Sequence, residues 1–493
     1  MTPTSASPSF DAAPAPHRER WTPRLAGVLI ALIWPTQLLV TVGILGSNAT
    51  ADVAQHFHTT QVAWFSLIVT LVSALLSPFV IKLGDLYGKK RIMLGMIALG
   101  VVGDVIAATA GSFELLLVGR ALAACYGPFP ALAFPAVRDI FPGRLVKSAS
   151  GILGSSLGLV ALVSPFLAGW LIDGWGYKGA MWFLAAATAV AFVLVATLVP
   201  ETPRHAFEPG FDWLGGLTLG GGLAVLVYAV GQGQTWGWGS GRTLGWLAAG
   251  VAALIGFLLV ERTSDHPILD LGVLRRRAVA TTVVSGALAQ AVAYTAPVVA
   301  ILLALYPHIP GVSAGFGWTA QHSAEVGVTW NLLLFVTGLV ASRFLRGVDT
   351  RWIWWAGLAT MGLGFLLAGF FHADAVQLTW TMCVASLGSG LVVAAAPVLV
   401  VGAVSTDEQG LGSGMLTMLT HVFGAVFSAA MFAALAADST VVKGTAFYGD
   451  SGYTLAFWVG ALLSLAALVV GLFIPALRDP EEEPRPAAAA AAV

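Results

Sequence analysis

The sequence IKLGDLYGKKR, residues 81–91, gathers charge in a chain that is otherwise poor in it. Of the 493 residues, 57% are hydrophobic and only 10% are Asp, Glu, Lys or Arg. The charged residues of the stretch are Lys82, Asp85, Lys89, Lys90 and Arg91. Long apolar runs lie on both sides of it, so these charges are predicted to occupy a short turn between two helices.

The bulk composition indicates a membrane protein. A soluble globular protein is about 45–50% apolar and about 25% charged, which differs widely from this chain. The net charge of −1 gives no reason to expect a nucleic acid partner. The two cysteines lie in apolar runs, and the sequence contains no phosphate loop of the form G-x-x-x-x-G-K-[ST]. We therefore predict a non-enzymatic protein without metal or cofactor that uses an ion gradient.

Fourteen apolar runs are long enough to cross a bilayer as helices, for which about 20 residues are needed. The tenth run is the weakest, because Glu325 and Asn331 interrupt it. The predicted spans are 24–47, 61–81, 92–110, 115–137, 148–171, 179–199, 213–231, 243–261, 279–304, 324–342, 352–371, 378–401, 412–436 and 453–475.

The distribution of Lys and Arg orients these spans, because cytoplasmic loops carry an excess of both. With a cytoplasmic N-terminus, 20 of the 24 basic residues fall in cytoplasmic segments, three fall in outer segments and Arg120 lies within a helix. A shift by one helix would remove this asymmetry. The pattern predicts a multi-pass protein of the inner (cytoplasmic) membrane with both termini inside, and it places residues 82–91 in a cytoplasmic turn.

Three motifs resemble those of the major facilitator superfamily of membrane transporters. The first is the opening stretch, which is similar to the loop signature G-x-L-a-D-r-x-G-r-k-r between helices two and three. The residues on its key positions are Asp85, Gly88, Lys89 and Arg91. The resemblance implies that Asp85 and Arg91 form a conformational latch that holds the outward-open state. The alternative is that Asp85 is a solvated loop charge.

The other two motifs lie in helices four and five. LLLVGRALAACYG is similar to the helix-four motif l-x-x-x-R-x-x-q-G, with Arg120 on the Arg position. GILGSSLGLVALVSPFLAGWL is similar to the antiporter signature that ends in G-P-x-x-G-G, here represented by Ser164, Pro165 and Gly169. The resemblance implies a bent helix that seals the cavity against proton leak, and hence antiport.

Residues 211–238 and 405–430 resemble the fourteen-helix drug:proton antiporter branch of this superfamily. The implied fold is all-α, with two pseudo-symmetric six-helix bundles around a cavity that opens alternately to each side. Its predicted parts are a tail over 1–22, an N-terminal bundle over 23–205, an inserted helix pair over 206–270, a C-terminal bundle over 271–476 and a tail over 477–493. The branch usually carries an acid in helix one, where this chain has Val42.

Asp104 and Arg120 are charges deep in helices three and four, where a charge costs at least ~2.5–3.5 kcal/mol. Each lies eight residues from the turn near residue 112, so an antiparallel hairpin brings them to the same depth. A direct or water-bridged pair that breaks when Asp104 is protonated would carry a proton. The resemblance also links the helix-four Arg to proton transfer. A static structural pair is the alternative.

Glu325 and His421 are two further candidates for proton coupling. Glu325 falls at the outer end of helix ten, where the resemblance implies a functional acid. His421 shares one helical face with Thr417 and Gly424. The alternatives are an ordinary interface residue for Glu325 and a satisfied interior group for His421.

Polar side chains at helical spacing are candidate walls of a substrate cavity. Such stripes serve equally well as contacts between helices, whereas large amphipathic rings suit a bulky hydrophobic ligand. The candidate cavity residues are Gln37 and Thr41 in helix one, Gln290 and Tyr294 in helix nine, and Trp330 and Asn331 in helix ten.

These observations together predict a monomeric, proton-coupled antiporter that exports hydrophobic drugs or similar small molecules. An exporter of lipid or of a self-made hydrophobic metabolite is one alternative. A proton-coupled solute symporter is another, against which the helix-five motif argues. Val42 leaves few carboxylates to attract a cation, which favours neutral or anionic cargo. A membrane sensor would need a signalling domain, and the predicted tails are too short for one.

Overall fold

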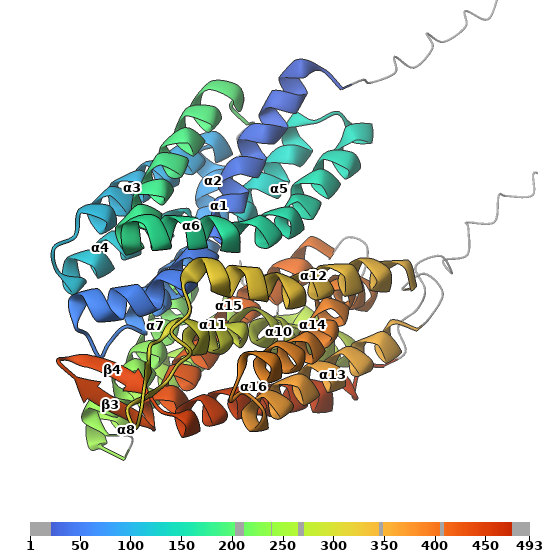
Figure 1. Cartoon of the computed structure of the whole chain (residues 1–493). Helices are drawn as coiled ribbons and strands as arrows, with labels where there is room; N and C mark the ends of the chain where they lie inside the picture. Colours follow the sequence, from blue (N-terminus) through green and yellow to red (C-terminus); the bar gives the residue numbers. More distant parts are fainter. Residues whose placement is uncertain are drawn as a thin grey trace, which may run out of the picture.

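The computed structural model describes residues 21–202, 212–237, 239–264, 271–344, 349–404 and 409–475. These residues are almost entirely helical, with two short β-hairpins (Figure 1). Twelve helical stretches are long and apolar enough to cross a membrane. The predicted all-α membrane fold is therefore confirmed, whereas the count of fourteen spans remains a prediction.

Helices of very different length follow one another along the chain, and the strands are short. In chain order, the helices are α1 (Pro23–Phe57), α2 (Trp64–Tyr87), α3 (Lys89–Thr109), α4 (Phe113–Ala123), the 3-10 turn η1 (Ala124–Tyr126), α5 (Phe129–Ile140), α6 (Gly143–Leu198), α7 (Trp213–Trp236), α8 (Gly241–Thr263), α9 (Leu271–Leu274), α10 (Arg277–Thr295), α11 (Pro297–Leu305), α12 (Ala320–Phe344), α13 (Thr350–Phe370), α14 (Ala375–Ala403), α15 (Gln409–Ala436) and α16 (Asp450–Gly471). The strands are β1 (His308–Ile309), β2 (Ser313–Ala314), β3 (Ser439–Val442) and β4 (Thr445–Tyr448).

Each of the fourteen predicted runs overlaps a helix, but the helices do not correspond one to one with the runs. Two runs form α6, which contains one break at Gly176. There φ is 65° and ψ is −168°, a conformation that glycine adopts without steric cost. The fourth run is divided into α4, η1 and α5, and the ninth is divided between α10 and α11 at Pro297. These interruptions fall where Gly and Pro remove the regular helix.

The helices form two groups that lie one above the other in Figure 1. The first helix group is α1–α6, in which α6 packs against α1 and α3. The second helix group is α10–α16, in which α13 packs against α14 and α16. Helices α6 and α12 make the main contact between the groups, and α7 contacts α2 and α15, one from each. This arrangement is what two related bundles with an inserted pair would give, although the predicted domain boundaries remain predictions.

Each group contains a helix pair whose backbones touch through glycine. A Cβ atom built on Gly103 of α3 would lie 2.6 Å from the Gly119 oxygen of α4, and one on Gly119 would lie 2.7 Å from the Gly103 oxygen. In the second group, a Cβ atom on Gly388 of α14 would lie 2.5 Å from the Gly357 oxygen of α13. Small residues permit such close packing in membranes. Both pairs are therefore closed to larger side chains.

Replacing Gly103 by Ala is expected to lower the melting temperature of the detergent-solubilised protein. The added methyl group must displace backbone, and overpacking of this kind costs about 1–3 kcal/mol. Gly95→Ala on the same helix is the matched control, because a Cβ atom there meets nothing within 4 Å. Equal melting temperatures for the two variants would contradict the close contact between α3 and α4.

The two β-hairpins lie at one end of the molecule. β1 pairs antiparallel with β2, and β3 pairs antiparallel with β4. The turn between β3 and β4 has positive φ at Lys443 (49°) and Gly444 (84°), as a type I′ turn requires. β4 is buried and β3 is exposed. The chain between α15 and α16 therefore folds back onto the helices rather than extending away from them.

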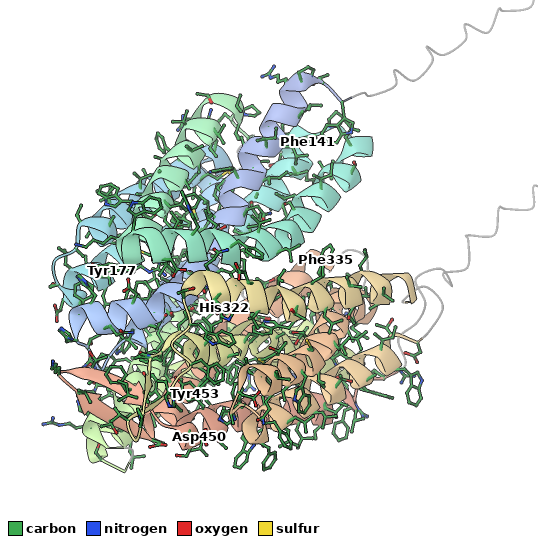
Figure 2. All side chains as sticks on the ribbon, in the orientation of Figure 1. Phe141, Tyr177, His322, Phe335, Asp450 and Tyr453 are labelled. Atoms are coloured by element: carbon green, nitrogen blue, oxygen red, sulfur yellow. The ribbon has the colours of Figure 1, made fainter. Side chains whose placement is uncertain are left out.

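Aromatic rings connect the turns at this end. The Tyr306 ring lies 5.3 Å from the Tyr448 ring, and the Phe57 ring lies 5.4 Å from the Tyr177 ring, between ring centroids. Figure 2 shows Tyr177 of the first group and Tyr453 of the second in the left half of the view. We call this the hairpin end. It carries the turns predicted to face outward, with residues 110–112, 173–176, 306–319, 371–374 and 437–449.

Candidate functional site

Asp104 is fully enclosed in the first helix group. Its side chain lies on α3 and has an exposed fraction of 0%. Thr188 of α6 donates a hydrogen bond from Oγ1 to Asp104 Oδ2, at 2.8 Å. The other carboxylate oxygen has no hydrogen-bond partner among the described residues. A buried polar atom without a partner is rare and costly, so it is a sign of a functional site.

Arg120 of α4 is buried beside it, with 2% of the residue exposed. Its guanidinium lies 4.7 Å from the centre of the Phe65 ring of α2, a cation–π distance. A Cβ atom on Gly46 of α1 would lie 3.0 Å from Arg120 Nη2, so α1 passes directly over the guanidinium. Nε and Nη1 have no hydrogen-bond partner in the described part of the chain. Arg120 is therefore enclosed by α1, α2 and α4.

The two charges are neighbours without a direct bond. The contact between Gly103 and Gly119 sets Asp104 and Arg120 at similar depth in the α3–α4 hairpin. No ion pair within 4.0 Å joins them in the part of the chain that the structure describes. Each charge thus keeps free hydrogen-bonding atoms beside the other. This arrangement differs from a closed ion pair, in which those atoms would be bonded to each other.

The loop between α2 and α3 forms a second charged site. Gly88 joins the two helices with a φ of 95°. Lys89 donates from Nζ to Asp139 Oδ2 at 2.6 Å, and its backbone N–H donates to Thr202 Oγ1 at 3.0 Å. Arg91 lies 3.7 Å from Glu201. The side chain of Asp85 lies outside the described residues, so its pairing with Arg91 remains a proposal.

Sequence analysis missed Asp139 and Glu201 as partners of this loop. Both acids follow helices that end at the predicted cytoplasmic side, which is the signal that could have identified them. Their contacts tie the loop to α5 and to the end of α6. The loop is therefore anchored within the first helix group.

The two ion pairs of this loop differ in burial, and Asp139→Asn tests the difference. The side chains of Lys89 and Asp139 are 4% and 19% exposed, whereas those of Arg91 and Glu201 are 61% and 43% exposed. Removing the partner of a buried charge is strongly destabilising, so Asp139→Asn is expected to cost about 2 kcal/mol, which thermal unfolding in detergent would detect. Arg91→Gln should change stability by about 0–1 kcal/mol. A larger loss in Arg91→Gln would reverse this assignment.

The helix-five motif lies between α1 and α12. Ser164 Oγ is 3.3 Å from Thr41 Oγ1 of α1, and either atom can be the donor. Pro165 lies inside α6. On the other side, a Cβ atom on Gly169 would lie 2.7 Å from the Gln321 Cα atom of α12. The motif thus places α6 in contact with both helix groups.

Most of the candidate cavity residues bind other helices. Gln37 donates to Ser156 Oγ of α6 at 2.5 Å, and Thr420 of α15 donates to Gln290 Oε1 at 3.2 Å. Trp330 is buried, and Asn331 is half-buried. Gln37, Thr41 and Gln290 thus hold helices together in this conformation, which was the alternative for polar stripes.

Tyr294 is different, because 60% of it is exposed although residues 289–293 of α10 are buried. The neighbouring Thr295 faces α15, where a Cβ atom on Gly424 would lie 3.9 Å from its Oγ1. His421 is half-buried one turn away on α15. Glu325 is exposed and accepts a hydrogen bond from Gln321, with His322 3.8 Å away. The structure therefore places Glu325 away from Asp104 and Arg120, on a different helix group.

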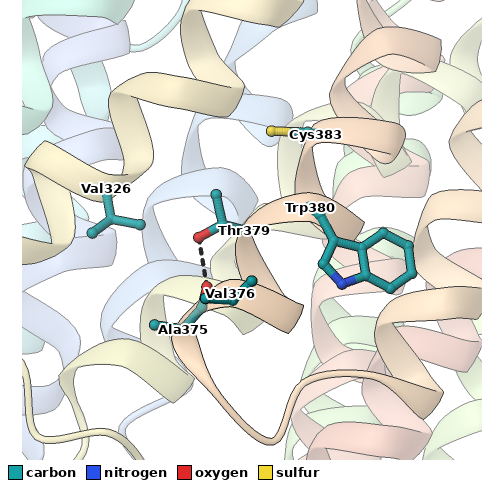
Figure 3. Close-up of a pocket in the computed structure, with 6 residues that line it drawn as sticks. All are labelled: Val326, Ala375, Val376, Thr379, Trp380 and Cys383. Atoms are coloured by element: carbon teal, nitrogen blue, oxygen red, sulfur yellow. Dashed lines mark hydrogen bonds between the residues drawn. The ribbon is translucent and has the colours of Figure 1, made fainter.

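The largest groove, of about 380 Å³, lies on the surface between α12 and α14 (Figure 3). Its walls are apolar and contain none of the predicted site residues. The lining residues are Val326, Ala375, Val376, Thr379, Trp380 and Cys383. A small space between α1, α2 and η1 is lined by Val42, Val69 and Tyr126 among others. Position 42, where the branch usually has an acid, therefore faces the interior.

A fold of two helix groups with charges buried inside one of them is typical of a membrane transporter. A sequence profile described as Major Facilitator Superfamily matches residues 33–324, which is more than half of the chain. The chain belongs to this superfamily, as the motifs predicted. Its relatives are membrane transporters and not enzymes.

Three relatives have named substrates. The probable actinorhodin transporter of Streptomyces coelicolor is 27% identical, over 83% of this chain and 72% of that protein. The tetracenomycin C resistance and export protein of Streptomyces glaucescens is 29% identical, over 49% of this chain and 47% of that protein. The uridine/deoxyuridine transporter of Lactococcus lactis is 27% identical, over 88% of this chain and 91% of that protein.

A solved structure supports the fold. The transporter PepTSo of the POT family superposes with a TM-score of 0.65 at 14% identity, over 92% of this chain and 98% of that one. The major facilitator fold predicted from the motifs is therefore confirmed. At this identity the similarity shows the fold alone.

Proposed function

We propose that this chain is a proton-coupled antiporter that exports hydrophobic small molecules across the cytoplasmic membrane by alternating access. Two of the three relatives with named substrates transport or export antibiotics, and the third carries nucleosides. The helix-five motif, with Pro165 and Gly169, supports antiport rather than symport. A monomer with both termini in the cytoplasm is part of the same proposal, supported by the positions of Lys and Arg.

The observation that carries the proposal is the enclosed carboxylate of Asp104. When Asp104 is ionised, its charge offsets the charge of Arg120; when it is protonated, Arg120 is left as a net positive charge. A charge change in the membrane interior is costly, so it favours a different helix arrangement. The free oxygen of Asp104 and the free guanidinium nitrogens supply atoms at which a proton can arrive and leave.

The substrate is proposed to be neutral or anionic and to contain an aromatic ring. Val42 puts an apolar side chain where an acid would attract a cation, and the candidate cavity residues are all uncharged. Tyr294 offers an exposed ring and a hydroxyl group, which suit stacking on a planar ligand and one hydrogen bond to it. Glu325 and His421 remain proposed as secondary proton groups near the second helix group.

A nucleoside is the second candidate substrate, because the uridine/deoxyuridine transporter matches most of both chains. A nucleoside is also a neutral ring compound, but it needs several hydrogen bonds. Gln290 and Gln37 could provide these only after giving up their bonds to Thr420 and Ser156. The exposed Tyr294 alone suits the more hydrophobic cargo better.

Asp104→Asn is expected to abolish export driven by the proton gradient while leaving the yield of folded protein unchanged. Asn keeps the size and the acceptor for Thr188 but cannot exchange a proton. Efflux of ethidium and of tetracenomycin C would be followed in a pump-deficient bacterium, with and without a protonophore. Asp374→Asn, at a turn of the hairpin end, is the control. Unchanged efflux in Asp104→Asn would remove Asp104 from the proton path.

Tyr294→Ala is expected to change the range of exported compounds more than the dependence on the proton gradient. The loss of the ring removes a stacking surface, worth about 0.5–1.5 kcal/mol beyond its area. Export of a panel of cationic dyes, neutral aromatic antibiotics and uridine would be compared with Tyr294→Phe, which keeps the ring. Identical profiles in all three proteins would place Tyr294 outside the substrate path.

A further inference from the structure

One acid of the first helix group binds the start of a helix in the second. Asp173 of α6 accepts a hydrogen bond from the Ala320 N–H at Oδ1 and another from the Gln321 N–H at Oδ2, both at 2.8 Å. These are the first two N–H groups of α12. Figure 2 marks the place by His322, at the start of α12 below α6. Sequence analysis did not single out Asp173.

The chemistry of this contact is that of a helix cap supplied by another helix. The first N–H groups of a helix have no partner within it and carry a partial positive charge. The next N–H of α12, from His322, is bonded to Thr319 Oγ1 at 3.1 Å, so the local cap is already in use. Two N–H groups remain, and a carboxylate has two oxygens. An ionised Asp fits them fully, whereas an amide offers one oxygen and one NH2 group.

The same turn of α6 also touches α12 backbone to backbone. Gly169 and Asp173 are four residues apart and share one face of the helix. A Cβ atom on Gly169 would lie 2.7 Å from the Gln321 Cα atom and 2.8 Å from its nitrogen. The close approach at Gly169 therefore brings Asp173 within hydrogen-bond distance of α12. Separation of the two helices would break both contacts at once.

The remaining hydrogen bonds between the groups lie at the same end. Thr445 of β4 donates to the Ala54 oxygen of α1 at 3.3 Å, and His58 Nδ1 lies 3.4 Å from Thr445 Oγ1. Between residues that the structure describes on both sides, every hydrogen bond linking the first group to the second is at the hairpin end. The structure is thus the form that is closed at this end.

We propose that Asp173 is the residue that holds the hairpin end closed, and that opening toward that side requires it to release the start of α12. This proposal rests on the alternating access of the proposed function and adds its closing contact. Among the contacts at this end, the Asp173 pair is the one that carries a full charge. Its loss should therefore shift the conformational equilibrium more than loss of the neutral Thr445 bond.

The test measures conformation and needs no substrate. Cys125 and Cys383 are replaced by Ser, and Ala54→Cys is introduced as the reporter, because Ala54 is fully buried beneath β4. The protein is placed in lipid nanodiscs, where both faces are accessible, and its rate of reaction with a charged maleimide is measured. Asp173→Asn is expected to raise this rate by about tenfold, within the usual range of conformational coupling.

A second variant removes a donor instead of the acceptor. Ala320→Pro deletes one of the two N–H groups at the first position of α12, where Pro is well tolerated, and should raise the rate in the same direction. Asp374→Asn is the matched control, because Asp374 caps α14 within the second group at the same end. Its rate should equal that of the parent.

The outcomes separate the two proposals. Slow reaction in folded Asp173→Asn and Ala320→Pro would overturn the closing role of Asp173. An equal increase in Asp374→Asn would also overturn it, since that result indicates general loosening of this end. Fast reaction in the two variants alone would support it, even if the wild-type protein exported none of the compounds tested.

Discussion

The hydrocarbon core of a bilayer offers no hydrogen-bond partner to a backbone or a charge, and the structure depends on this constraint. Where the helix breaks at Gly176, the freed N–H of Tyr177 donates to Asp52 of α1 at 2.5 Å. Where a carboxylate enters α3, Thr188 donates to it. The free atoms of Asp104 and Arg120 are exceptions to this rule, which is why they mark a functional site rather than a scaffold contact.

The same constraint decides how the helices associate. Lipid is as apolar as the helix surfaces, so contact between helices must come from close packing and polar bonds. Reciprocal glycine contacts between α3 and α4, and between α13 and α14, supply the packing in each group. Thr41 with Ser164 and Gln290 with Thr420 supply the polar bonds. That each group uses the same device in one helix pair agrees with a fold built from two related halves.

Much of the fold could be predicted from the sequence because apolar length and the positions of Lys and Arg are local properties. The break in α6 was predicted as two separate runs, since Gly176 and its polar neighbours interrupt the hydrophobicity. Partners distant in the chain could not be predicted: nothing in residues 81–91 identifies Asp139, and nothing near Asp173 identifies Ala320. For the same reason, equal spacing from a turn predicted the depth of Asp104 and Arg120, but not whether their atoms would touch.

Helix α1 connects the sites that a transport cycle must coordinate. Within nine residues, Gly46 lies against the guanidinium of Arg120, Asp52 binds the break in α6, and Ala54 accepts the bond from Thr445. A rearrangement around Arg120 is therefore passed to the hairpin end through two turns of a rigid helix, without any change in side chains between them. The break at Gly176 lies between Asp173 and Thr188, so α6 can turn near α12 while its second part keeps its bond to Asp104. Proton uptake and opening are thus linked by α1 and given separate freedom by α6, which is what alternating access requires of an antiporter.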